Sequence, residues 1–485
     1  MQSDALTALS YAFVAMPYVA ALSLGLVLPM LGVLCYSSFG ASVSVIAGMF
    51  VVEALYMFVG GISLGVSLFY TDFALLFAFV IGVLRLLFAT DRPGVHRAWM
   101  VYSAVAALSL ASGLATYGTG AGVQARPYFY FSAAALFGMS FAVDENKVRL
   151  MLNLVAGIAV ALLCLTIYRW IVYYTPIAEL LPPEGAYNND GPIRVVRSYE
   201  ALVLAQALVT SLFFARGVAG LVVARAVSPL LLMAVVVLQH RSVWGAALAG
   251  LLASVFVARL QKSSALGQAF LIVAIIVTTA LPMVLTDKLA GVGGQIASSA
   301  GAAVQERGSA GERLSSWKEI INNWAAAGPR SIAIGQSFGT DPSRFVRDEA
   351  GVVRKLEYTA HNMYVQTLFN TGLVGLGAFL LAAVYVVHGL YRACASGQGG
   401  VPAQALLVLV LMQLVYYVPY GTDYLQSLIF GVAMSYVAGH EARAKARARA
   451  AAAAEANAGT AAGTAAAAAV AAKPARRRSS GWGWA

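Results

Sequence analysis

The sequence predicts an all-α membrane protein that crosses the bilayer many times. Hydrophobic residues make up 60% of the 485-residue chain, and charged residues make up only 11%. The mean hydropathy is +0.76, whereas a soluble domain carries about 25% charged residues. Apolar stretches recur along the chain, and a helix needs about 20 such residues to cross a bilayer. We therefore expect a bundle of transmembrane helices rather than a soluble domain.

The apolar stretches give the positions of the expected spans. The first 98 residues hold roughly two to four spans, a number blurred by Pro17, Pro29, Gly60 and Gly61. After them, we expect spans near 99–115, 127–143, 148–174, 199–215, 218–238, 242–258, 267–286, 363–391, 402–420 and 424–439.

Positive charge gives the expected orientation. The tail after residue 440 is rich in Lys and Arg, which predicts a cytoplasmic C-terminus. Of the five histidines, only His240 and His361 then face the exterior. The chain divides into a transmembrane domain, 1–440, and an alanine-rich basic tail, 441–485, that continues the last helix or is disordered. The segments on the outer side are 116–126, 175–198, 239–241, 287–362 and 421–423.

The outer segment 287–362 is long enough to contain short helices. Within it, Leu314, Trp317, Ile320, Ile321 and Trp324 recur at helical spacing, which predicts an amphipathic helix near 312–325. Its tryptophans indicate a helix at the membrane interface, over the bundle. The later Gly335–Gly339 segment is typical of a turn.

A polar pair ends this loop and opens the next apolar stretch. His361-Asn362 is followed by nine residues, Gly372, two residues and Gly375. In one continuous helix, His361, Gly372 and Gly375 would fall on a narrow stripe. Glycines on that stripe would let a neighbouring helix approach closely. We therefore expect His361 at the mouth of a tightly packed helix pair, at the membrane surface.

This motif resembles that of the bacterial O-antigen ligases, and more loosely that of the O-antigen polymerases and protein O-oligosaccharyltransferases of the same superfamily. The resemblance implies about 12 spans, a periplasmic loop at 287–362 and a place in the inner membrane of a Gram-negative bacterium. It implies an undecaprenyl-diphosphate-linked O-antigen as donor and lipid A-core as acceptor. It also implies that an arginine before a span and one in the large loop act with the motif histidine, positions that Arg241 and Arg313 match by context.

The chemistry of these residue types agrees with such a substrate. An arginine fork binds phosphate oxygens in a bidentate manner and can neutralise charge on a leaving diphosphate. A histidine at a helix N-terminus stays neutral and can accept a proton from an attacking hydroxyl. The expected catalytic residues are His361, Arg241 and Arg313. The expected substrate-binding residues are Arg241, Arg313, His240, Asn362, Arg194 and Arg197.

Each assignment has a simpler alternative. Arg241 could be a snorkelling anchor at a span boundary, and Arg313 could pair with Glu312 or Glu306. His361 could be an ordinary interfacial residue, and His240 could merely orient Arg241. For Arg194 and Arg197, the better interpretation is that they are loop residues whose charges are solvated. Glu53 falls in an early span, where a carboxylate often marks a transport path.

The sequence therefore predicts an O-antigen ligase that works without cofactor or metal and inverts the anomeric carbon. A diphosphate donor already carries the driving force, so neither a P-loop nor a metal is needed. The chain has only three cysteines, which are scattered, and no nucleic-acid partner is expected. A polymerase or a protein oligosaccharyltransferase remains open within the superfamily. A secondary transporter or glycan flippase is the alternative from another class, which inverted repeats would favour.

Overall fold

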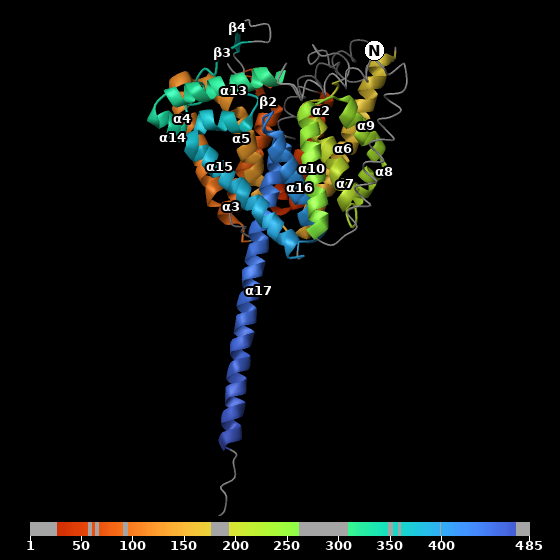
Figure 1. Cartoon of the computed structure of the whole chain (residues 1–485), viewed down its shortest axis with the longest axis vertical. Coiled ribbons are helices and arrows are strands. Elements are labelled where there is room, and N and C mark those ends of the chain that lie inside the picture. The colour runs from red at the N-terminus through yellow and green to blue at the C-terminus, as the bar shows by residue number, and fades with distance from the viewer. Residues whose placement is uncertain are drawn as a thin grey trace, which may run out of the picture. The chain divides into compact units, whose positions relative to one another are not determined.

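The structure is a computed structural model that describes residues 27–56, 61–63, 67–90, 96–175, 194–260, 309–347, 353–356, 360–397 and 399–471. These residues are almost entirely helical (Figure 1). The exceptions to the all-α prediction are two antiparallel hairpins. One pairs β1 (Gly61–Ser63) with β2 (Ser67–Phe69), and the other pairs β3 (Arg344–Arg347) with β4 (Val353–Leu356).

Six helices within the described ranges are long and apolar enough to cross a membrane. They are α2 (Phe39–Tyr56), α3 (Tyr70–Phe88), α4 (Arg97–Tyr117), α6 (Glu145–Tyr174), α10 (Arg241–Leu260) and α15 (Met363–Ala395). The bent pair α7 (Ser198–Phe214) and α8 (Ala219–Ala226) would make a seventh span. The structure also describes the shorter apolar helices Val27–Ser37, α9 (Ser228–Val237) and α16 (Gly400–Tyr416), and the longer helices α5 (Thr119–Met139) and α17 (Tyr424–Ala471).

The expectation of several spans is confirmed, while the count of about 12 stays a prediction. The expected span 267–286 lies outside the described residues. The helix α16, which corresponds to the expected span 402–420, has 17 residues and belongs to the shorter apolar helices. One expectation is wrong: the segment 218–238 is not a single span but the separate helices α8 and α9.

Backbone chemistry explains two breaks in this region, the one between α8 and α9 and the one between α7 and α8. Pro229 lies in the first turn of α9, where its missing N–H and fixed φ are tolerated. Gly217, with φ +78°, turns the chain between α7 and α8, which meet at a bend of 105°. The N–H of Gly220 then donates to the Asn153 side chain of α6 at 2.8 Å, which ties α8 to α6.

The core lies where α7, α16 and the beginning of α17 meet. In α7, 15 of the 17 residues are buried, and in α16, 12 of the 17. The helix α10 packs against both. Gln206 of α7 and Gln426 of α17 exchange reciprocal side-chain hydrogen bonds of 2.8 Å. Polar groups hidden in a bundle must be paired in this way. On the other flank, α15 packs against α4, and α3 packs against α5.

The expected amphipathic helix is α13 (Ser309–Ala326), followed by α14 (Pro329–Ile334). Ile320 and Trp324 are buried against Phe369 at the beginning of α15, whereas Leu314 and Ile321 are exposed. With Trp317, which packs against the same cluster, three of the five residues of the predicted stripe face the bundle. We call the end of the bundle that bears this helix the α13 end; it is uppermost in Figure 1.

The residues Gly439–Ala485 form a separate unit. Their described part continues α17 as a helix as far as Ala471. Alanine is the best helix former, which explains why so long a run stays helical.

Candidate functional site

His361 stands directly before α15 in a left-handed backbone conformation, with φ +46°. Few residues other than glycine adopt this region, and those held in it cluster at functional sites. The next residue, Asn362, is the N-cap of α15, and its Oδ1 accepts from the N–H of Val365 at 3.0 Å. The motif asparagine therefore fixes the start of the helix and the direction of the preceding histidine.

A cavity of about 120 Å³ opens beside His361. Its walls come from α5, from the start of α15 and from the loop between α16 and α17. One of the walls is Gln366, whose Oε1 accepts from the N–H of Ala360 at 3.1 Å. The Nε2 of Gln366 is buried and has no hydrogen-bond partner among the described residues. It could donate to a bound hydroxyl. The lining residues are Gln124, Pro127, Tyr128, His361, Asn362, Met363, Gln366, Gly421 and Thr422.

Arg313 approaches His361 from α13. Its Nη1 donates to the carbonyl of Pro419 at 3.1 Å, and its guanidinium lies 5.4 Å from the centre of the Tyr420 ring. The Tyr420 ring in turn lies 6.2 Å from the ring of His361. Two tryptophans fix α13: Trp317 donates to the carbonyl of Ala360 at 2.7 Å, next to His361, and Trp324 anchors the following turn.

The sequence analysis missed a second arginine near this histidine. Arg344 of β3 is buried, and its Nε donates to Ser316 of α13 at 2.6 Å. Enclosure by protein, and then the positive charges of Arg313 and Arg344, lower the pKa of His361 below its usual value of 6.5. The side chain keeps an exposed edge. His361 is therefore a neutral imidazole near pH 7 that a substrate can reach.

Arg241 opens α10 at the same end. Its Nε is buried and has no hydrogen-bond partner in the described part of the chain. The adjacent His240 is buried, with Nε2 3.0 Å from the carbonyl oxygen of Val196. This contact holds the start of α10 against the segment before α7, which agrees with an orienting role for His240.

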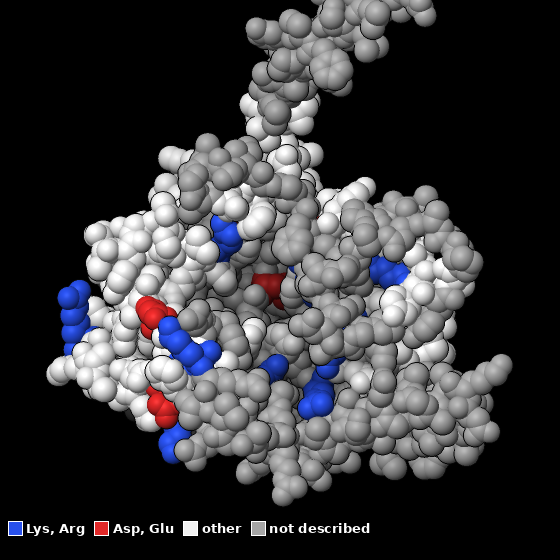
Figure 2. Space-filling view, turned by 90° about the horizontal axis from the view of Figure 1, so that it is seen from above, with Lys and Arg blue, Asp and Glu red and all other residues white. Residues whose placement is uncertain are grey.

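A continuous set of contacts joins Arg241 to the histidine. Ser242 lies 3.2 Å from Ser198, oxygen to oxygen, and the Ser198 side chain lies close to that of Tyr416. Tyr416 stacks on Tyr420 with ring centres 5.3 Å apart, and Tyr420 borders both Arg313 and His361. In Figure 2, Lys and Arg side chains lie around a hollow whose floor shows an acidic side chain. Arg241, Arg313 and His361 thus belong to one surface of the molecule.

A comparison with protein families finds that residues 226–380 match the model described as O-antigen ligase. The match extends from the end of α8 to the kinked part of α15 and includes His240, Arg241, Arg313 and His361. The match supports a relation of this chain to the O-antigen ligase/polymerase superfamily. A search of curated proteins finds no match.

The glycines of the O-antigen ligase motif act differently from the expectation. Gly372 is not helical, with φ +63° and ψ −166°, so α15 is kinked there and the expected stripe is not continuous. A side chain at Gly372 would collide with the backbone of Ala333 and Gly335. A side chain at Gly375 would meet Thr371 of its own helix. The first glycine therefore admits the end of α14 and the residue that follows it, rather than a long transmembrane helix.

The Gly335–Gly339 segment follows α14 and lies within the residues that match the family model. The N–H of Gln336 donates to the carbonyl of Phe369 at 2.7 Å, just before the kink. Phe338 is fully buried, with its ring centre 4.9 Å from that of Tyr128. The segment is a turn, as expected, and it wedges between α4, α5 and α15. It holds the first part of α15, and with it His361, in place.

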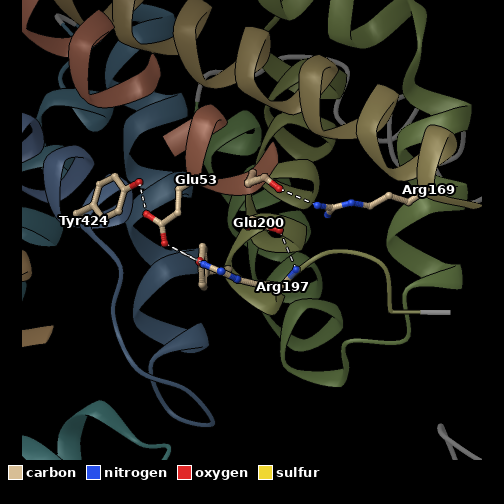
Figure 3. A network of polar contacts seen from close by, with 7 residues as sticks. Glu53, Arg169, Arg197, Glu200 and Tyr424 are labelled. Carbon is tan, nitrogen blue, oxygen red and sulfur yellow. Dashed lines mark hydrogen bonds and ion pairs between the residues drawn. The ribbon is translucent and has the colours of Figure 1, made fainter. Parts of the chain in front are cut away.

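The remaining predicted arginines lie in or near a separate network, shown in Figure 3. Arg197 pairs with Glu53 of α2 at 2.9 Å, and Tyr424 of α17 donates to the same carboxylate at 2.8 Å. Glu53 is therefore part of a polar clamp between helices. Arg194 is half-buried at the start of the same segment. Substrate binding by Arg194 and Arg197 stays a prediction.

The loop between α16 and α17 contributes residues that hydropathy placed partly within a span. Tyr420 and Thr422 border the histidine, and the adjacent Asp423 caps α17 through the N–H groups of Leu425 and Gln426. Burial raises the pKa of Asp423 to about 7. Tyrosine and threonine are common in apolar sequence, so the sequence pattern alone did not mark Tyr420 and Thr422 as site residues.

Proposed function

We propose that this protein is an O-antigen ligase, which transfers O-antigen polysaccharide from undecaprenyl diphosphate to lipid A-core. The reaction takes place at the periplasmic face of the inner membrane of a Gram-negative bacterium. The observation that carries the proposal is that His361, whose pKa is lowered, lies at the same end of the bundle as Arg313 and Arg241, which have no carboxylate partner among the described residues. The donor's diphosphate would supply the counter-charge that these arginines do not receive from a described carboxylate.

The reaction is a single displacement. An acceptor hydroxyl oxygen attacks the anomeric carbon of the donor sugar, and His361 takes the proton of that hydroxyl. The bond between the anomeric carbon and the diphosphate oxygen breaks, and undecaprenyl diphosphate leaves with the electron pair. Arg241 and Arg313 neutralise the charge that grows on the leaving group. Because attack and departure occur on opposite faces, the anomeric configuration is inverted.

Deletion of the gene tests the reaction in cells. A ligase mutant should lose all long-chain lipopolysaccharide on a gel while lipid-linked polymer accumulates, and re-expression of the wild type should restore the pattern. Lipopolysaccharide capped with a single repeat would identify a polymerase instead. Unchanged lipopolysaccharide, together with reduced glycosylation of secreted proteins at Ser or Thr, would identify a protein oligosaccharyltransferase. Retention of full transfer by purified protein in EDTA is the expected result for a metal-independent enzyme.

Labelling tests the side of the membrane. Asn323 is exposed on α13, on the helix that carries Arg313. A membrane-impermeant thiol reagent should label Asn323→Cys in intact spheroplasts, whereas a cysteine at exposed Arg443 should be labelled only after lysis. The reverse pattern would place the site in the cytoplasm and exclude the ligase reaction.

A further inference from the structure

An apolar groove of about 430 Å³ lies between α3, α4 and α5. It is separate from the cavity beside His361. Its walls are almost entirely aliphatic and aromatic, with small residues along α4 that make room. The lining residues are Phe79, Leu86, Trp99, Met100, Ser103, Ala104, Ala106, Ala107, Leu110, Ala125, Tyr128, Phe129, Ser132, Leu136 and Phe338.

The groove is elongated along the helices. On α4 it extends from Trp99, near the first residue of the helix, to Leu110. At 1.5 Å per residue this is about 16 Å, or roughly half of the hydrocarbon thickness of a bilayer. On α5 it extends from Leu136 back to Ala125, towards the α13 end. A narrow apolar space with this direction fits one hydrocarbon chain that lies along the bilayer normal.

The groove is open to the lipid on one side. Met100, Ala104 and Ala107 line it and are exposed on the surface of α4, a helix apolar enough to span. A chain can therefore enter sideways from the bilayer. The opposite wall is closed by Trp99 and Phe338, which are buried.

One residue joins the groove to the candidate site. Tyr128 lines both the groove and the cavity beside His361, and its hydroxyl accepts from Asn370 of α15 at 3.3 Å. Phe338 closes the groove at this end and belongs to the loop that contacts the carbonyl of Phe369 through Gln336. A lipid chain in the groove would thus end at the α5 side of the site.

The side of the site that bears Arg241 differs in chemistry from the side that faces the apolar groove. Arg241 lies on α10, which packs against α7 and α16, whereas the groove belongs to α3, α4 and α5. The cavity with His361 uses Gln124, Pro127 and Tyr128 of α5 and therefore faces the groove. A diphosphate held at Arg241 would lie away from the groove. The base must instead contact the acceptor hydroxyl, so the lipid on the groove side is the acceptor.

We propose that the groove between α3, α4 and α5 binds one acyl chain of the acceptor glycolipid and so places its sugar hydroxyl at His361. This inference rests on the proposed function. Burial of a chain there would stabilise the acceptor complex through contact with the aromatic and aliphatic wall, at the expense of contacts with other lipids. The donor's polyprenyl chain and an ordinary membrane lipid are the competing occupants.

Filling the groove tests this assignment. Ala104→Phe places a ring in the groove, whereas Val101→Phe places one on the exposed side of α4, outside the lining residues. Purified full-length protein should be assayed with lipid A-core and with the same acceptor after removal of its acyl chains. We expect Ala104→Phe to raise KM for lipid A-core about 10-fold or more. Neither kcat, the KM for the donor, nor any constant for the deacylated acceptor should change.

Each other outcome overturns the inference. A rise in KM for the donor would assign the groove to the polyprenyl chain. Equal constants for Ala104→Phe and Val101→Phe would leave an ordinary membrane lipid as occupant, and an equal rise for both acceptors would exclude the acyl chain. If Ala104→Phe does not fold, Ala107→Leu makes the same comparison with a smaller side chain. Absence of transfer to either acceptor by the wild type would refute the proposed function itself.

Discussion

Two groups of arginines lie at the α13 end and differ in their partners. Arg197 and Arg126 belong to the first group, and each pairs with a carboxylate, Glu53 at 2.9 Å and Asp72 at 3.1 Å. A tyrosine supports each carboxylate: Tyr424 donates to Glu53 and Tyr130 donates to Asp72, both at 2.8 Å. Each arginine of this group therefore has a counter-ion within the protein.

The second group, Arg241 and Arg313, has no carboxylate partner among the described residues. Arg313 contacts a carbonyl and an aromatic ring, and the Nε of Arg241 has no hydrogen-bond partner there. A half-buried cation without a counter-ion is costly, whereas a bound anion can offset that cost. The comparison indicates that the first group fastens helices together and the second awaits an anionic ligand.

The largest expected effect is a loss of turnover on substitution of His361, compared with His388 on the helix α15 that follows it. His361→Ala should lower kcat about 10²- to 10⁴-fold, because a positioned general base contributes that much. His388→Ala, on an exposed face of α15, should retain wild-type activity. Both variants should keep the wild-type Tm. Full activity in His361→Ala would remove the histidine from the mechanism.

The next effect compares the two groups of arginines directly. Arg241→Lys and Arg313→Lys keep the charge but lose the bidentate fork, so turnover should fall about 30- to 1000-fold. Arg126→Lys, whose partner is Asp72, should lower Tm and leave the turnover of folded protein nearly unchanged. Rates should be measured with purified protein and lipid-linked donor. Wild-type turnover in Arg313→Lys would argue against a phosphate fork at that position.

A smaller effect concerns pH. The base must be neutral, so activity should rise with pH and level off, with a midpoint below about 6.5 because the pKa of His361 is lowered. A nearby cation disfavours the imidazolium, so Arg344→Gln should raise this pKa and move the midpoint to higher pH. Arg344→Lys keeps the charge and should leave the midpoint in place. A rate that falls as pH rises through this window would instead assign His361 the role of acid to the leaving diphosphate.

The smallest effect on catalysis is expected in the paired group. Glu53→Gln leaves Arg197 without its counter-ion and should lower stability by about 1–3 kcal/mol. The activity of the protein that remains folded should change little. The double variant E53Q/R197Q should regain part of the lost Tm, because the uncompensated cation is gone. A large loss of activity with unchanged Tm would place Glu53 in the substrate site rather than in a clamp.

Hydropathy and charge predicted much of the architecture. The spans near 99–115, 148–174, 199–215 and 242–258 correspond to α4, α6, α7 and α10 with small shifts at the ends. The amphipathic helix in the large loop was predicted from the helical spacing of its apolar residues, and it is α13. These features depend on local periodicity, which a sequence displays directly. The break between α8 and α9 escaped the prediction because the apolar run continues through it.

The sequence by itself determined that the chain is a polytopic helical protein and that His361, Arg241 and Arg313 are the groups to examine. Only the tertiary structure decided how they are held. Arg344 and Tyr420 reach the histidine from segments distant in sequence, and no periodicity relates them. At the kinked Gly372, the backbone of Ala333 at the end of α14 and of Gly335 occupies the space that a side chain would fill. Such contacts depend on which surfaces meet, and a single sequence does not display them.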